Sequence, residues 1–133
     1  MEKIIRIEET IFKTQEIDWC TFTGYQIITD KQSIKIGISD GQSCCEQWGF
    51  FMSDDNLEDY INSELISVEI VDTELKTKIK DMFEYGLNEG DTMFVNFNTS
   101  NGVLQFVAYN SHNGYYGHYA IILSEQLNYD KRI

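Results

Sequence analysis

The chain has no proline and few basic residues. Its 133 residues include 10 lysines and arginines against 22 aspartates and glutamates, which gives a formal net charge of −12. Residues 36–75 and 81–130 contain no lysine or arginine at all. A negative field of this kind repels nucleic-acid backbones and anionic membrane surfaces. We therefore expect no direct contact with nucleic acid or membrane, whereas a basic protein surface would be attracted.

Long apolar runs are missing as well. No stretch approaches the ~20 residues needed to cross a bilayer. The first ten residues, MEKIIRIEET, carry acids where a secretory signal has an uninterrupted apolar segment. The three cysteines, an odd number in a chain without such a signal, indicate reduced thiols. These features predict a cytoplasmic protein.

Short apolar runs with strand-like alternation recur along the chain and predict one domain over residues 1–133. The runs at 25–30 and 33–40 predict a hairpin, and Asn101-Gly102 predicts a second. An apolar stripe predicts a helix over 73–86, and a capping aspartate predicts a short one over 56–62. Residues 126–133 read as a loose tail. The predicted class is α+β: a mostly antiparallel sheet of about six to seven strands with one or two helices.

Soft metal ligands are present, but their spacing is wrong for a standard site. A structural zinc ion needs about four converging ligands, usually in pairs two to four residues apart. His112, His118 and the adjacent Cys44 and Cys45 do not match that pattern. The anionic surroundings would also raise the pKa of a nucleophilic thiol. No phosphate loop or nucleophile elbow is present. We expect neither a cofactor nor a metal, and no enzymatic activity.

Aromatic and amide side chains are concentrated in two predicted neighbouring segments. The strand at 92–98 and the hairpin around the turn SHNG at 111–114 supply them, and the candidates for ligand binding are Phe94, Phe97, Asn98, His112, Asn113, Tyr115 and Tyr116. Stacked rings beside amide edges suit a planar base, because stacking one base on an aromatic ring contributes ~1–3 kcal/mol. The alternative interpretation is an ordinary sheet with aromatic cross-strand pairs.

Four segments together carry a resemblance to a family of small phage and bacterial domains. They are DGQSCCEQWGFF at 40–51, NSELISVEIVD at 62–72, VNFNTSNGVLQFVAYN at 95–110 and HNGYYGHYAIIL at 112–123. The chain resembles the anti-Thoeris proteins over roughly residues 24–123, with 73–90 as an insertion. The matching positions are Cys44, Cys45, Glu46, Thr99, Gly102, Asn113, Gly114, Tyr115 and Tyr116. The family uses arginine near its ligand, whereas this chain has no arginine between Arg6 and Arg132.

The resemblance implies a phage-type anti-defence protein in the host cytoplasm. Such a protein would be a homo-oligomer that binds and sequesters a nucleotide-derived immune signal, a cyclic ADP-ribose isomer, without catalysis. Its partner would be that small molecule. The acidity supports an alternative function, a nucleic-acid mimic that inhibits a host defence nuclease such as a CRISPR effector and so binds a basic host protein. A module for an uncharged ligand, or a structural protein, also remains open.

Overall fold

The computed structural model spans residues 1–133 and describes all of them except 16, 18–19, 42–46, 77, 84–89 and 112–116 and the side chain of residue 80. The described chain is nearly all β. Its strands are β1 (Ile4–Phe12), β2 (Phe22–Thr29), β3 (Ser33–Ser39), β4 (Gln47–Met52), β5 (Leu65–Val71), β6 (Asp91–Thr99), β7 (Gly102–Ser111), β8 (Tyr119–Leu123) and β9 (Asn128–Arg132). The α+β prediction is therefore wrong.

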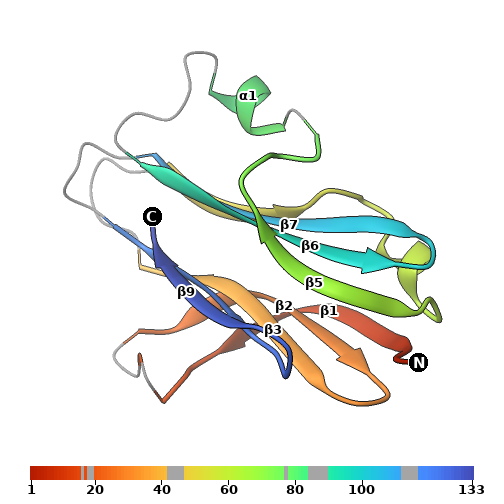
Figure 1. Ribbon diagram of the computed structural model, residues 1–133. Coiled ribbons are helices and arrows are strands. Elements are labelled where there is room, and N and C mark those ends of the chain that lie inside the picture. The colour runs from red at the N-terminus through yellow and green to blue at the C-terminus, as the bar shows by residue number, and fades with distance from the viewer. Residues whose placement is uncertain (16, 18–19, 42–46, 77, 84–89, 112–116) are drawn as a thin grey trace.

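The strands form two antiparallel sheets that pack face to face (Figure 1). The five-stranded sheet has the order β1-β2-β3-β8-β9, and the four-stranded sheet has the order β4-β7-β6-β5. Antiparallel sheets of this kind bury one face and expose the other, which matches the alternation in the sequence. The prediction of one sheet failed because alternation marks a buried face without telling which sheet a strand joins.

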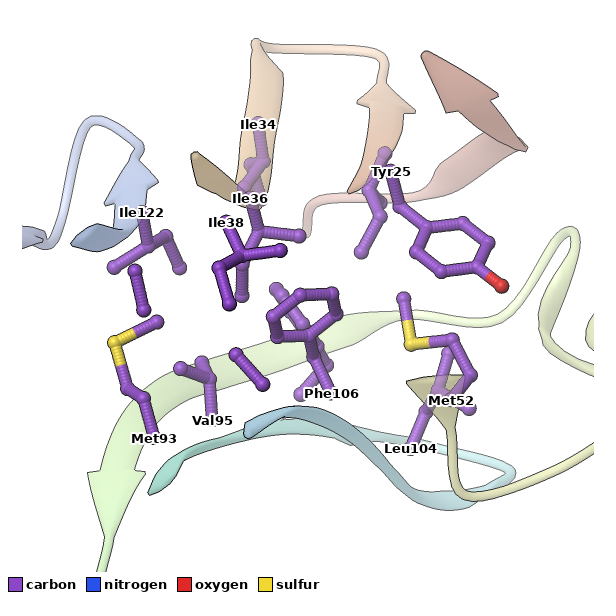
Figure 2. Close-up of a cluster of buried hydrophobic side chains, with 14 of the residues drawn as sticks. Tyr25, Ile34, Ile36, Ile38, Met52, Met93, Val95, Leu104, Phe106 and Ile122 are labelled. Carbon is purple, nitrogen blue, oxygen red and sulfur yellow. The ribbon is translucent and has the colours of Figure 1, made fainter. Parts of the chain in front are cut away.

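The core lies between the two sheets. Ile34, Ile36 and Ile38 of β3 are all 0% exposed. They point toward Val95 of β6 and Phe106 of β7 in the opposite sheet (Figure 2). Burial of one such side chain contributes about 1.5–3 kcal/mol. The isoleucines at alternate positions of β3 therefore anchor the five-stranded sheet to its partner.

Both predicted hairpins are confirmed. Strands β2 and β3 pair antiparallel, with Tyr25 opposite Ile36. Strands β6 and β7 also pair antiparallel, with Thr99 opposite Gly102, so Ser100 and Asn101 lie between the paired residues instead of the predicted Asn101 and Gly102. Gly102 has a φ of +110°, a conformation that glycine adopts without steric cost. Local turn chemistry was therefore sufficient to predict these two connections.

The helices are much shorter than expected. The described helical segments are a 3-10 turn, η1 (Leu57–Tyr60), and an α-helix, α1 (Lys78–Met82). Five residues are too few to bury an amphipathic stripe independently. No described helix has the length and apolar content that a membrane crossing requires.

The segment around α1 covers the outer face of the four-stranded sheet (Figure 1). Gln105, only 1% exposed, accepts a hydrogen bond from the Leu75 amide at 2.7 Å and donates one to the Thr73 carbonyl at 3.1 Å. The Phe83 ring packs edge-on against Tyr109, with centroids 5.8 Å apart. The outer face of this sheet is thus partly protected from solvent by the segment that the sequence marked as an insertion.

The prediction of a loose tail over residues 126–133 is also wrong. Residues 128–132 form β9, which pairs with β8 and places Tyr119 opposite Arg132. Ile133 follows and is 3% exposed in the main core. The segment NYDKR has no apolar alternation, so its strand conformation comes from pairing with β8 and the burial of Ile133.

Candidate functional site

An open pocket of about 540 Å³ lies where the edges of the two sheets meet. One wall comes from the four-stranded sheet, at the end of β5 and the beginning of β6, and the other comes from β9. Both β5 and β9 are the last strands of their sheets. Because no further strand follows either one, the space between the sheets stays accessible at this edge.

The pocket has an apolar floor and a charged rim. Met93 is 2% exposed, and it lines the pocket together with the half-buried Ile70; both belong to the side of the sheet that faces the core. Phe94, which is 8% exposed, also lines the pocket, but its side chain lies on the opposite face of β6. The rim carries Asp72 and Asp91 from one sheet and Tyr129 and Lys131 from the other. An apolar floor with a few polar groups above it is typical of small-molecule sites.

Lys131 connects the two walls. Its Nζ atom lies 3.0 Å from Oδ2 of Asp91 and donates a hydrogen bond of 2.9 Å to the Thr92 carbonyl. The Asp91 Oδ1 atom in turn accepts the Thr92 amide at 2.8 Å. These contacts hold the ammonium group at a defined position beside the pocket, although about a third of the side chain is exposed.

Two further rim groups are open to solvent. Tyr129 is 41% exposed, which leaves ring surface available for stacking. Asp72 is also exposed, and its Oδ1 atom accepts the Thr73 hydroxyl at 3.2 Å. The pocket therefore offers one ring, one cation and one further carboxylate to a ligand.

The structure places three of the sequence-predicted ligand residues on β6, and they do not converge. Phe94 lines the pocket, whereas Asn98 lies four residues further along the same face, at about 13 Å for an extended strand. The Asn98 amide donates to Ser67 at 2.8 Å and to Glu69 at 3.1 Å. Phe97 points the other way and is 0% exposed in the core, so its ring has no free face for stacking. Of these three, only Phe94 belongs to the pocket.

The other four predicted ligand residues, His112, Asn113, Tyr115 and Tyr116, lie outside the described residues, as do Cys44 and Cys45. The described parts of the chain hold no group of three or more His, Cys, Asp or Glu side chains suited to a metal ion. The expected ligand-binding turn therefore stays a prediction.

His118, the described histidine, is buried and hydrogen-bonded within the fold, which indicates a structural role. It is 3% exposed, and its Nδ1 atom donates to the Ser39 carbonyl at 2.6 Å. Its ring packs on Trp48 with centroids 4.8 Å apart.

Burial and the nearby charge of Asp40 raise the pKa of the Cys20 thiol, which disfavours the reactive thiolate. Neither His118 nor Cys20 lines the pocket.

Sequence reasoning missed most of the pocket residues. Tyr129 and Lys131 lay in the supposed tail, and Asp72 and Asp91 were two acids among many. One signal was available: Lys131 ends a run of fifty residues, 81–130, that has no lysine or arginine. A cation in such a position has few competitors for nearby carboxylates.

Residues 2–122 match the family described as "Domain of unknown function (DUF7448)", and the chain belongs to that family. Among curated proteins, none matches the chain. Among solved structures, none matches it either.

Proposed function

We propose that this protein is a phage-type anti-defence protein that captures a nucleotide-derived immune signal, a cyclic ADP-ribose isomer, and holds it without chemical change. The observation that carries the proposal is the pocket at the sheet edges, where the Tyr129 ring and the Lys131 ammonium group of β9 lie across from Met93 of β6. Aromatic surface can stack on a base, and an ammonium group can bind a phosphate oxygen.

The pocket also has a suitable size. Small-molecule sites have volumes of roughly 300–1,000 Å³, and this pocket has about 540 Å³. The walls belong to different sheets but are tied together by the contact between Lys131 and Asp91. A tied, pre-formed pocket supports binding because less conformational entropy is lost when the ligand enters.

Thermal unfolding with and without each cyclic ADP-ribose isomer tests the proposal. A ligand that binds only the folded state raises the melting temperature by mass action, by about 2.7 kcal/mol of stability at a hundred times its Kd. The bound compound is then released by heating and analysed by chromatography. Intact release supports capture, and a hydrolysed product contradicts it.

A matched pair of variants locates the binding site. Tyr129→Ser removes an exposed ring from the pocket, and Ile11→Ser removes an exposed side chain, 68% accessible, from β1. We expect the first variant to lose the thermal shift and the second to keep it. Equal shifts in both variants would place the ligand elsewhere on the protein.

We also propose that the protein forms a homo-oligomer and acts in the host cytoplasm. Light scattering coupled to size-exclusion chromatography, with and without ligand, measures the number of protomers. A monomer that still binds ligand would remove the oligomer from the proposal and leave capture intact.

The distribution of acids favours a second candidate function, inhibition of a host defence nuclease by nucleic-acid mimicry. No aspartate or glutamate is buried among the residues that the structure describes. Asp55, Glu58 and Asp59 are all exposed around η1. A mimic would bind a basic nuclease, and its affinity would fall steeply between 50 and 500 mM salt, because exposed charges are screened. Binding that is insensitive to salt would exclude this function.

A further inference from the structure

The charge balance of the pocket restricts what it can hold. Its lining includes Lys131 as the cation and Asp72 and Asp91 as anions. The net charge of these three groups is negative, and the whole chain carries −12. Each additional negative charge on a ligand is therefore repelled, both locally and at long range.

Lys131 has limited capacity for an anion. A lysine ammonium group has three N–H donors. One is directed to the Asp91 carboxylate at 3.0 Å and one to the Thr92 carbonyl at 2.9 Å. The third donor can reach one oxygen of a ligand, so Lys131 can neutralise one phosphate or carboxylate.

The opposite part of the rim accepts hydrogen bonds. Asp72 uses Oδ1 for the Thr73 hydroxyl, at 3.2 Å, and a carboxylate has further lone pairs on both oxygens. An amino group or a hydroxyl on the ligand can donate to them. Tyr129 lies on the facing wall and offers its ring to a planar group.

We infer that the pocket holds ligands with a planar, donor-bearing ring and a single phosphate on Lys131, and that it selects against a second phosphate. The inference rests on the proposed function and assigns its ligand class by charge. A nucleotide-derived signal with two phosphates would place only one of them inside this pocket. The other would have to lie outside it, in solvent or against another protomer.

Calorimetric titration with adenosine, AMP and ADP at low salt tests the charge count. We expect AMP to bind about tenfold more tightly than adenosine, and ADP to bind no more tightly than AMP. Lys131→Met should abolish the preference for AMP over adenosine, and Lys131→Arg should retain it. Lys13→Met, which removes an exposed lysine that does not line the pocket, changes the net charge equally and should leave the preference unchanged.

Several results would overturn the inference. They are tenfold tighter binding of ADP than of AMP, an AMP preference that survives Lys131→Met, and no binding of any of the three compounds. The proposed function fails separately. Cyclic ADP-ribose isomers that bind wild type and Lys131→Met equally would support capture and reject this pocket chemistry. AMP binding that depends on Lys131, without any effect of those isomers, would support this pocket chemistry and reject the capture of cyclic ADP-ribose.

Discussion

The ammonium group of Lys131 lies 3.0 Å from the carboxylate of Asp91, and this contact joins the last strand of one sheet to the first residue of β6 in the other. The two residues are 40 positions apart in the sequence, and each is partly exposed, at 35% and 52%. Both residues line the candidate pocket. Because both side chains are partly exposed, a variant of Lys131 can test the role of this ion pair in binding separately from its role in stability.

Lys131→Met should cost little stability. Ion pairs between exposed side chains contribute about 0.2–1 kcal/mol, because water screens them. We expect the urea midpoint of Lys131→Met to correspond to a loss below about 1 kcal/mol, with an unchanged slope. A loss of several kcal/mol would mean that Lys131 holds the sheets together, and its ligand effects would then need reinterpretation.

Gly24 should not tolerate a side chain. It lies opposite Gly37, and a Cβ atom at Gly24 would approach the Ile36 carbonyl oxygen to 2.0 Å. Gly24→Ala should therefore destabilise the protein by about 1–3 kcal/mol or more, as overpacked sites do. Gly41, where a Cβ atom would meet none of the described residues within 4 Å, provides the control. Chemical denaturation of both alanine variants checks this, and equal stabilities would contradict the close strand approach.

Phe97 should matter for stability and not for ligand binding. Its ring is fully buried in the core between the sheets. Phe97→Ala should lower the free energy of unfolding by about 3–5 kcal/mol through loss of burial and the cavity left behind. The milder variant Phe97→Leu should fold and retain ligand affinity within about twofold, measured by calorimetry. A selective loss of binding in Phe97→Leu would restore Phe97 to the ligand site.

Stability should fall at alkaline pH through Tyr109. Burial raises the pKa of the Tyr109 hydroxyl above its ordinary value, which is about 10 in an unfolded chain. Above that pH the unfolded state loses the proton more readily, so the free energy of unfolding decreases as pH rises. Below it the contribution is fully present. Urea titrations from pH 8 to 11 should show this decrease, and Tyr109→Phe should reduce its slope.

Much of the β structure could be predicted from local patterns. The alternating isoleucines predicted strand β3, and the Asn101-Gly102 dipeptide predicted the hairpin of β6 and β7. Both predictions worked because side-chain direction and turn formation depend on adjacent residues. The helix over 73–86 was overpredicted for the same reason. Its apolar residues read as a helical stripe, whereas Leu75 is held by Gln105 of β7 and the described helix is only Lys78–Met82.

The candidate pocket depended on information that no local pattern contains. Phe94 and Phe97 were both identified as aromatic rings beside amides. They are three residues apart on one strand, so the alternation of side chains puts the two rings on opposite faces of β6. Tyr129 and Lys131 had no strand signal, since NYDKR lacks alternation. Their position follows from pairing with β8.

The sequence by itself determined the acidity, the positions of most strands and two of the turns, because these depend on composition and on neighbouring residues. Only the tertiary structure decided that the strands divide between two sheets, that residues 128–132 become β9, and that Lys131 meets Asp91 on the Met93 side of β6. These outcomes depend on which distant strands pair and which edges remain open. Many pairings bury the same apolar faces, so the choice between them is made by packing over the whole chain.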